Sequence, residues 1–568
     1  MKQTRARFKY AFRQCKRMEA KVKADALAGD MAELDYKKFW KKAGQLNRKS
    51  TPVADTINDA NGRENIAGMW KDHFQKLYNV VCNDKHKQSV SESLKDTMFN
   101  QTDYVSVDEV SKVIKGLKHG KSAGPDGLVA ENLIFATPTV VVHLTMCLNA
   151  FLSHCYLPDD LIKSVLIPIV KNKCGDLTNA DNYRPIALSS VMSKLLEIVL
   201  LKRMEDYLTV SDNQFGFRKA HSTDLCVYTL KQLIEFHMKH ATPTFICFLD
   251  ASKAFDRVNH WTLFKKLVDR NVPLYIVRIL VYWYSSLEYL VLWNGFLSQS
   301  FRVTNGVRQG GVLSPKLYAV FVDDLSHKLN ASGIGCSIGG QLLNHFSFAD
   351  DMALCALTAG GMQRLLRICE EYAVEHDILY NPQKTVCMLV RPKGLSDLRS
   401  MDLTVNGRNL RYVAQHKYLG VILSHDRSDV FDIKRQMRSL YMRANMLVRK
   451  FNMCSHDVKK HLFQTFCANM YCAQLWSDYT ETAMSKLRIA YNNCLRRFLG
   501  YWKFCRASGM FVECDIMSFC ELVRNYIYSF RSRIVKSSNV LVAAVYDCSV
   551  LWRGHLQSEW RRKLYTKR

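Results

Sequence analysis

The sequence of 568 residues lacks any apolar run close to the ~18 residues that a membrane-spanning helix requires. Its best candidate, residues 274–284, is interrupted by Arg278. The N-terminus lacks the apolar core of a secretion signal, because the basic residues from Lys2 to Lys9 lead into no hydrophobic stretch. We therefore expect neither a membrane protein nor a secreted one.

Metal-binding cysteine motifs and internal repeats are also missing. None of the 19 cysteines stands in a C-x-x-C spacing, which removes the usual zinc-binding arrangement. Cysteines scattered through a long chain without a secretion signal favour reduced thiols inside a cell. With 48% hydrophobic and 23% charged residues, the composition excludes a disordered or fibrous protein and allows several folded domains.

Acidic residues are few relative to basic ones at both ends of the chain. Lys and Arg number 80 against 52 Asp and Glu, a net charge of +28. Residues 1–50 hold +10 of this charge and residues 431–568 hold +15, so the centre is nearly neutral. This distribution indicates a catalytic body between surfaces that bind a polyanion. Nucleic acid is the first candidate, and simple solubility is the alternative.

One basic segment near the C-terminus has the pattern of an amphipathic helix. Apolar residues from Ile433 to Phe451, Tyr441 among them, recur at the helical period. Lys434 and Arg438 lie on the opposite side of this predicted helix. The basic side is either an ordinary solvated surface or a contact for a phosphate backbone.

Three further basic residues stand on separate elements in the first half of the chain. Lys171 ends a short predicted strand, Arg184 lies in an extended segment because Pro185 follows it, and Arg218 follows a Gln-Phe-Gly sequence. Together these residues suit the binding of phosphates, although each alone is also typical of a surface charge.

Two acidic sites adjoin predicted buried strands. Residues 244–249 are rich in aromatic and β-branched residues and lead directly to Asp250. Residues 345–356 form two apolar runs around Asp350 and Asp351, which is the pattern of a β-hairpin with carboxylates at its turn. Asp250 alone would also suit a helix cap. Three carboxylates beside apolar strands favour two bound Mg²⁺ ions, which would serve in-line phosphoryl transfer.

A second Asp-Asp pair, Asp323 and Asp324, has a different setting. Ser314 and Pro315 begin a predicted helix whose apolar residues recur at helical spacing. We therefore expect this pair on the flank of a helix, with a structural role.

The ordered motifs of residues 110–425 resemble the reverse transcriptases of non-LTR (LINE-type) retrotransposons, jockey-like elements among them. The motifs are GPDG at 124–127, NYRPI at 182–186, FLDASKAFD at 248–256, NGVRQGGVLSP at 305–315, FADD at 348–351, NPQKT at 381–385 and YLGV at 418–421. Each motif alone is weakly specific, but the complete set in this order is very specific.

The resemblance implies an α+β fold of the right-hand polymerase type. It predicts a basic helical N-terminal extension or linker at 1–105, and fingers and palm at 106–427 with the core at 151–427. A helical, basic thumb and C-terminal region would occupy 428–568. The palm would carry the aspartates on an antiparallel sheet, and the helix at 433–451 would face the template–primer duplex.

The resemblance also assigns roles to individual residues. Asp250, Asp350 and Asp351 would be catalytic and would bind two Mg²⁺ ions, with Mn²⁺ as a substitute. The other assigned residues are Lys384 as proton donor to the leaving pyrophosphate, Arg184 and Lys171 as ligands of the incoming triphosphate, Gln309 and Gly310 as the floor under the nascent base pair, and Phe255 as the gate whose ring excludes ribonucleotides.

The activity implied is RNA-directed DNA polymerisation, in which dNTPs are added to a primer 3′-hydroxyl on an RNA template at a DNA target. We expect no endonuclease in this chain, because the residues before 106 are too few for one. A nuclear location is expected, since the family acts on chromosomal DNA. Two alternatives are a catalytically inactive or domesticated relic that binds nucleic acid, and an intron-encoded or viral polymerase, which the GPDG and ADD settings disfavour.

Overall fold

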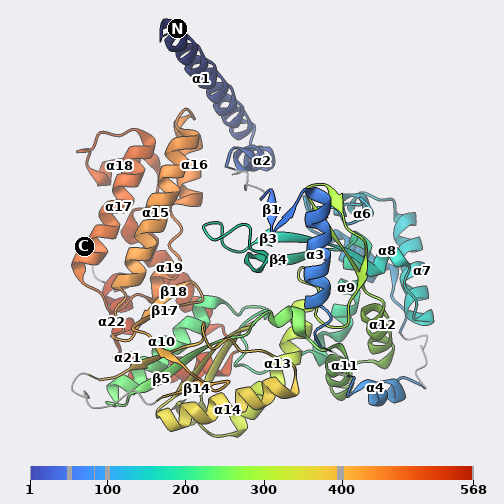
Figure 1. Ribbon diagram of the computed structural model, residues 1–568. Coiled ribbons are helices and arrows are strands. Elements are labelled where there is room, and N and C mark those ends of the chain that lie inside the picture. The colour runs from blue at the N-terminus through green and yellow to red at the C-terminus, as the bar shows by residue number, and fades with distance from the viewer. Residues whose placement is uncertain (1, 48–53, 82–83, 96–102, 393–401, 566–568) are drawn as a thin grey trace.

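The computed structural model describes residues 2–47, 54–81, 84–95, 103–392 and 402–565. The chain folds into α+β architecture with two five-stranded sheets and a C-terminal helical region (Figure 1). Across the described ranges, no helix combines the length and the apolar character that crossing a bilayer demands.

The central sheet has the strand order β11-β12-β5-β13-β16. Its strands are β11 (His345–Phe348), β12 (Asp351–Ala356), β5 (Thr244–Asp250), β13 (Val386–Val390) and β16 (Arg411–Tyr412). The middle strand, β5, is buried along its whole length except at Asp250. The buried strand predicted at 244–249 is therefore confirmed, and it ends at the expected carboxylate.

Helices cover both faces of the central sheet. Phe245, Cys247 and Leu249 of β5 share a core with α13 (Ser314–Ala331) and α14 (Ala359–Glu375). Ile246 and Phe248 point to the other face, where α10 (Thr223–Lys239) packs. Because successive side chains of a strand alternate between faces, a strand buried on both sides is mainly apolar, as β5 is from Phe245 to Leu249.

The second sheet has the strand order β4-β3-β6-β7, and β8 pairs with β6. Its strands are β3 (Lys163–Val170), β4 (Tyr183–Leu188), β6 (Glu288–Trp293), β7 (Phe296–Leu297) and β8 (Phe301–Arg302). Helix α3 (Arg63–Leu77) packs on this sheet through Trp70, whose ring centroid lies 5.8 Å from that of Trp293. The boundary predicted at residue 105 therefore does not match the packing, because α3 belongs to the core of the second sheet.

A group of helices packs beside the second sheet around a third core. It comprises α5 (Val107–Lys115), α7 (Pro138–His154), α9 (Val191–Met204), α11 (His260–Asp269) and α12 (Leu274–Ser285), together with the shorter α4 (Lys87–Ser93), α6 (Ala130–Ile134) and α8 (Asp159–Ile162). Short ribbons complete the strands: β1 (Thr56–Ile57) with β2 (Ala60–Asn61), β9 (Ser337–Ile338) with β10 (Gln341–Leu342), β14 (Thr404–Val405) with β15 (Arg408–Asn409), and β17 (Gln415–Tyr418) with β18 (Val421–Ser424).

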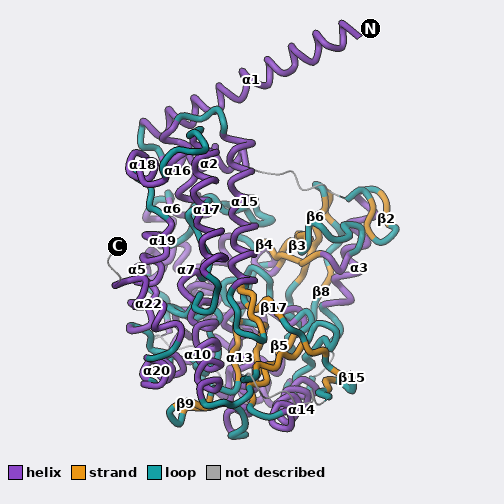
Figure 2. The backbone as a smooth tube through the Cα atoms, turned by 90° about the vertical axis from the view of Figure 1, so that its left-hand side faces the viewer, coloured by secondary structure: helices purple, strands orange, loops and turns teal. Residues whose placement is uncertain are grey.

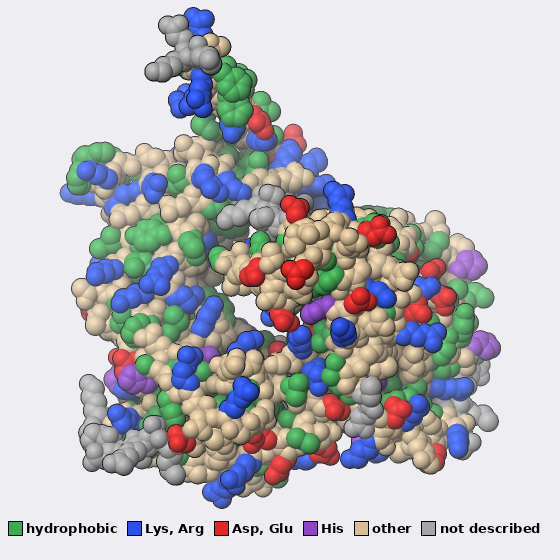
Figure 3. All heavy atoms as spheres, in the orientation of Figure 1, with side chains coloured by type: hydrophobic (Ala, Val, Ile, Leu, Met, Phe, Trp, Pro, Cys, Tyr) green, Lys and Arg blue, Asp and Glu red, His purple; other side chains and the backbone are tan. Residues whose placement is uncertain are grey.

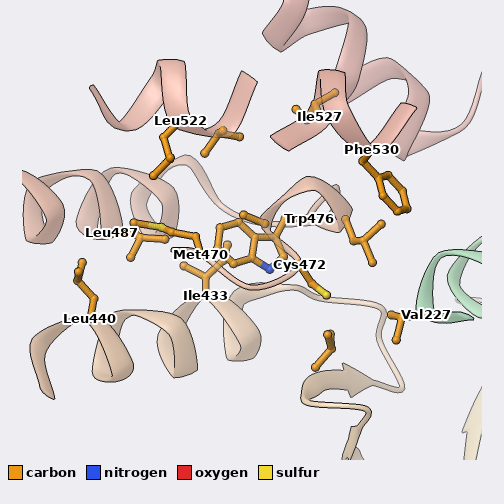
Figure 4. Close-up of a cluster of buried hydrophobic side chains, with 14 of the residues drawn as sticks. Val227, Ile433, Leu440, Met470, Cys472, Trp476, Leu487, Leu522, Ile527 and Phe530 are labelled. Carbon is orange, nitrogen blue, oxygen red and sulfur yellow. The ribbon is translucent and has the colours of Figure 1, made fainter. Parts of the chain in front are cut away.

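The C-terminal region is helical. Its helices are α15 (Val430–Phe451), α16 (His456–Phe466), α17 (Glu481–Leu499), α18 (Ala507–Cys514), α19 (Phe519–Val535), α20 (Val540–Asp547), α21 (Ser549–Trp552) and α22 (His555–Tyr565). Trp476 lies at the centre of their core, among Ile433, Met470 and Leu487 (Figure 4). The predicted apolar stripe of α15 is confirmed at Ile433 and at its other buried positions, but Tyr441 is exposed, so it was wrongly included.

The N-terminal helices join this C-terminal region. Phe39 of α2 (Tyr36–Asn47) is fully buried, and its ring lies 5.6 Å from His461 of α16. Helix α1 (Lys2–Ala32) projects away from the body in both Figure 1 and Figure 2. The two basic ends of the sequence therefore lie together, because α2 packs on α16.

Candidate active site

Three carboxylates meet at one end of the central sheet. Strands β5 and β12 are antiparallel neighbours, and their register sets Asp351 directly opposite Asp250. Ala349 and Asp350 form the two-residue turn that joins β11 to β12, and Asp351 is the first residue of β12. The predicted hairpin and the predicted meeting of its acids with the end of β5 are therefore both present.

The turn that carries Asp350 is held by the segment at 214–216. The Gln214 side chain accepts a hydrogen bond from the Ala349 backbone N–H at 2.9 Å, and its amide donates to the Ala349 carbonyl at 3.3 Å. Gly216 lies so close that a Cβ there would stand 2.4 Å from the Ala349 nitrogen. Ala349 itself has a φ of +60°, a conformation that these contacts stabilise.

Arg218, which follows this segment, contacts residues of its own loop. Its guanidinium pairs with Asp212 at 2.9 Å and donates to the Ser211 carbonyl at 3.1 Å. Arg218 therefore holds its own loop, and the hypothesis that it joins Lys171 and Arg184 at phosphates stays a prediction.

The surroundings of Asp350 and Asp351 disfavour their charged forms. Burial, with the charges of Asp350 and Asp250, raises the pKa of Asp351 to about 6, although the side chain remains open to solvent on one side. Burial also raises the pKa of Asp350, and the positive charge of Arg184 opposes that rise. A carboxylate that is destabilised by its neighbours gains most from a nearby cation.

The donor set suits a hard divalent cation. Within the described ranges, no three acidic, histidine or cysteine side chains already converge into a set that could hold a metal ion. The acids at this sheet end nevertheless offer only carboxylate oxygens, which are the ligands that Mg²⁺ prefers. Burial raises the pKa values of Asp350 and Asp351 and so disfavours their charged forms, and such an ion would compensate that charge.

Lys384 stands beside the first of these acids. Its ammonium nitrogen lies 4.0 Å from a carboxylate oxygen of Asp250, and 69% of its side chain is exposed. The turn that carries it is tied to β5, because the Asp250 N–H donates to the Thr385 hydroxyl at 3.2 Å and the Asn381 N–H donates to the Asp250 carbonyl at 2.9 Å. Lys384 is thus close to the site and free to move.

A cationic group lies on the second sheet near the acids. Lys171 follows β3, and Arg184 is exposed on β4, whose register pairs it with Ile169. Burial, followed by the charges of Lys253 and Arg184, lowers the pKa of Lys171. Lys253 joins the group through Asp181, whose carboxylate is 3.3 Å from its ammonium. Lys253 was not among the predicted residues, although it lies within the FLDASKAFD motif.

Phe255 lies between this group and the core. Its ring stacks on Tyr318 with centroids 4.4 Å apart and meets Phe217 edge-on at 6.1 Å. Burial raises the pKa of Tyr318, and the charges of Asp350 and Asp351 add to that rise. The stacked rings of Phe255 and Tyr318 therefore lie near Asp350 and Asp351.

Gln309 and Gly310 form a tight loop against β4. The Gln309 carbonyl accepts a hydrogen bond from the Ala187 N–H at 2.8 Å. Gly310 has a φ of +111°, and a Cβ there would lie 3.0 Å from the Ala187 carbonyl oxygen. Both features require glycine, since other residues rarely adopt this conformation.

Two residues for which the sequence pattern predicted no role hold this loop. Asp256 is buried, and one of its oxygens accepts hydrogen bonds from the Gln309 amide at 2.7 Å and from the Tyr78 hydroxyl at 3.0 Å. Burial raises the pKa of Asp256 to about 6. Asp256 ends the FLDASKAFD motif, but no sequence pattern connects it with Tyr78.

A buried ion pair holds the same loop from its other side. Glu197 of α9 is 2.5 Å from Arg308 and also accepts a hydrogen bond from the Val312 N–H at 2.7 Å. The Arg308 guanidinium stacks over Trp283 at 4.3 Å. The loop with Gln309 and Gly310 therefore stands between two buried carboxylates, Glu197 and Asp256.

The second Asp-Asp pair has the predicted structural setting. Both acids lie on α13, and Asp323 is buried with its carboxylate 2.5 Å from Arg270. It also accepts a hydrogen bond from the Ser211 N–H at 2.8 Å. Asp324 pairs with Lys266.

Comparison with known proteins identifies the central part of the chain. Residues 169–423 match the profile of a family described as reverse transcriptase (RNA-dependent DNA polymerase). This range contains β4, β5, β6, β12 and β13, all three carboxylates and the loop at 308–312.

Relatives from mobile elements match over most of the chain. It is 26% identical over 502 residues to the RNA-directed DNA polymerase from mobile element jockey of Drosophila funebris, covering 84% of this chain and 54% of the relative. It is 24% identical to the probable RNA-directed DNA polymerase from transposon BS of Drosophila melanogaster, covering 94% and 61%.

A third relative is the retrovirus-related Pol polyprotein from type-1 retrotransposable element R2 of Popillia japonica, with 29% identity over 255 residues, covering 44% of this chain and 34% of the relative. The chain thus spans between a third and about three fifths of the length of these three relatives.

Proposed function

Because the chain carries a reverse transcriptase domain of the kind found in non-LTR retrotransposons, we propose that it is an RNA-directed DNA polymerase. Its substrates would be dNTPs, a primer 3′-hydroxyl and an RNA template. The observation that carries this proposal is the register of β5 and β12, which sets Asp250 opposite Asp351 beside the turn at Asp350. A nuclear location belongs to the same proposal, since the DNA target would be chromosomal.

In this mechanism, Asp250, Asp350 and Asp351 would hold divalent ions, with Mg²⁺ favoured by their oxygen donors. Such ions, when bound, favour ionisation of the primer hydroxyl and stabilise charge on the leaving pyrophosphate. The three carboxylates would orient around the reacting phosphate, and Asp351 stays mostly ionised at neutral pH, because its pKa is raised only to about 6.

The basic residues would bind the incoming triphosphate and protonate the departing pyrophosphate. Arg184, Lys171 and Lys253 present positive charge from the side of β3 and β4, which suits three phosphates. Lys384 can give a proton to the departing pyrophosphate, because its ammonium lies beside Asp250 and is exposed. The loop with Gln309 and Gly310 would support the nascent base pair, with Asp256 and Glu197 as positioning residues.

The proposal extends to a right-hand architecture. The central sheet would be the palm, the second sheet with its helices the fingers, and the helices from α15 onward the thumb. Figure 3 shows a hollow between the C-terminal helices and the second sheet, with basic side chains on the C-terminal wall. Such a wall suits the phosphates of a template–primer duplex.

Primer extension tests the proposal. On poly(rA)/oligo(dT) with Mg²⁺ and dTTP, the wild type should incorporate nucleotide. Asp350→Asn should lower the rate on the order of 10³-fold, because it removes a charge that stabilises the transition state. Asp324→Asn is the matched control from the other Asp-Asp pair and should keep activity. RNA binding without synthesis by the wild type would contradict the proposal and favour the inactive relic.

Sugar selection is tested at Phe255. The ring, stacked on Tyr318, would collide with a ribose 2′-hydroxyl, so Phe255→Ala should lower discrimination between dTTP and UTP by about one to two orders of magnitude. Competing incorporation of the two nucleotides measures this ratio. Phe217→Ala, which removes only the neighbouring ring, is the control, and unchanged discrimination in Phe255→Ala would remove the gate.

A further inference from the structure

An ordered loop between α17 and α18 exposes two large aromatic rings. In this loop, residues 500–506, 68% of Trp502 and 64% of Phe504 are exposed. Their rings meet edge-on with centroids 4.6 Å apart, and the Lys503 ammonium lies 4.6 Å from the Phe504 centroid. Two exposed rings beside a cation form an unusual surface for a protein that has ample core to bury them.

The loop is held in shape by its own hydrogen bonds. The Arg496 guanidinium donates to the Cys505 carbonyl through two nitrogens, at 2.9 and 3.1 Å. The Cys505 N–H donates to the Trp502 carbonyl at 3.0 Å, and Gly500 ends α17 with a φ of +83°. The rings therefore stand on a fixed support, which lowers the entropy cost of binding a partner.

Basic residues outnumber acidic ones around the loop, where Glu513 of α18 interacts with Tyr501. Residues 482–512 contain six Lys or Arg and no Asp or Glu. Arg497, Lys503 and Arg506 are exposed in or next to the loop. Figure 3 shows hydrophobic and basic side chains side by side at the outer tip near α18. A partner must therefore offer flat apolar faces together with negative charge.

The loop lies away from the acids of the central sheet. Helices α15 and α17 run side by side (Figure 2). Near their starts, Trp476 donates to Asp432 at 2.9 Å, and Asp432 also accepts from Ile422 of β18. At the other end, Arg497 donates to Asn445 at 3.1 Å. The 22 residues of α15 span about 33 Å, so the loop is roughly that far from β18.

We propose that this aromatic tip, residues 500–506, is a second nucleic-acid site that binds an unpaired strand. Bases would stack on Trp502 and Phe504, and Lys503 and Arg506 would contact the flanking phosphates. Unpaired bases expose the ring faces that stacking needs, whereas a duplex hides them, so the tip fits a single strand. The choice of nucleic acid as partner rests on the proposed function.

A binding assay with the catalytic site occupied tests this proposal. The full chain is saturated with an unlabelled RNA–DNA duplex whose primer lacks a 3′-hydroxyl, and a labelled 15-nucleotide single strand is then titrated by fluorescence anisotropy. The double variant Trp502→Ala with Phe504→Ala should weaken strand binding at least about tenfold, because two stacking contacts are lost. Lys503→Glu should also weaken binding and make it less salt-dependent.

Val512→Ala supplies the matched control. This aliphatic residue is 82% exposed on α18, near the tip, but offers no ring for stacking. Strand binding should not change in this variant. Equal strand affinity of the wild type and the double aromatic variant would overturn the proposal, as would an equal loss in Val512→Ala.

Other partners appear as distinct outcomes. Sedimentation with phosphatidylserine vesicles that depends on both rings, without strand binding, would make the tip a membrane contact and overturn the proposal. Self-association that the double aromatic variant abolishes, without strand binding, would make the tip a contact between copies, with the same consequence. Asp350→Asn separates this inference from the proposed polymerase, since it should lose incorporation and keep strand binding at the tip.

Discussion

The two Asp-Asp pairs of this protein end nearly identical tetrapeptides, FVDD at 321–324 and FADD at 348–351. Their surroundings differ in charge. Asp350 and Asp351 lie at a hairpin turn opposite another acid, and the pKa of each is raised. Asp323 is buried on α13 against Arg270, and Asp324 pairs with Lys266. A buried carboxylate whose cationic partner is removed leaves an uncompensated charge, whereas a carboxylate among other carboxylates is destabilised by their charge.

The difference arises from the secondary structure around each pair. In a helix, neighbouring side chains point to different directions, so each acid of α13 reaches a partner on another element. At a two-residue hairpin turn, adjacent acids stay close to each other and to the neighbouring strand. The two settings meet at Tyr318, which lies on α13 and whose pKa is raised partly by Asp350 and Asp351.

Removing an acid of the pair on α13, whose members have cationic partners, should have the largest effect on stability. Asp323→Ala leaves Arg270 and the Ser211 N–H without their buried acceptor, so the free energy of unfolding should fall by about 3 kcal/mol. Urea denaturation measures this change. Asp269→Ala, which removes an exposed ion pair with Lys265, should cost no more than about 0.5 kcal/mol. Equal losses in both variants would contradict the comparison.

Asp256 sharpens the comparison because it is buried like Asp323 but has neutral partners. Asp256→Ala leaves the Tyr78 hydroxyl and the Gln309 amide without an acceptor, so unfolding free energy should fall by about 2 kcal/mol. The KM for dNTP should rise more than kcat falls, because Gln309 loses its position. Asp256→Asn keeps the accepting oxygen and should restore both quantities, and a failure of that rescue would show that the charge is essential.

The smallest effect on stability should come from titrating Asp351, which belongs to the Asp-Asp pair at the hairpin turn. The pKa of Asp351 in the folded chain is about 6, above the ~3.9 of an unfolded chain, so ionised Asp351 destabilises the fold above pH 6. This penalty is relieved as the pH falls from 6 towards 3.9.

Without metal, the stability of the wild type relative to Asp351→Asn should therefore increase between pH 7.5 and pH 5. The gain should stay below about 1 kcal/mol, because solvent screens a partly open carboxylate. Urea midpoints of both proteins at the two pH values measure it. A relative stability that decreases over this interval would contradict the charge excess at the hairpin.

Much of the site could be read from local sequence patterns. The apolar run before Asp250 has to be a buried strand, and the two runs around Asp350 form a hairpin because their turn is short. The helix that carries Asp323 was also predictable, from its start at Ser314 and its apolar spacing. Such local features depend on residues close together in the chain.

The contacts between distant segments could not be read in this way. Tyr78 reaches Asp256 across 178 positions, and α3 packs on the second sheet although its sequence suggested a linker. The exposure of Tyr441 could not be predicted either, because the helical period does not show how wide the buried face of α15 is.

The sequence by itself determined which elements form and where the acids stand within them, because short-range periodicity and turn chemistry decide both. Only the tertiary structure decided which acids meet one another and which meet cations. It set Asp351 opposite Asp250 and Asp323 opposite Arg270, because strand register and helix packing depend on the burial of the whole core rather than on any local pattern.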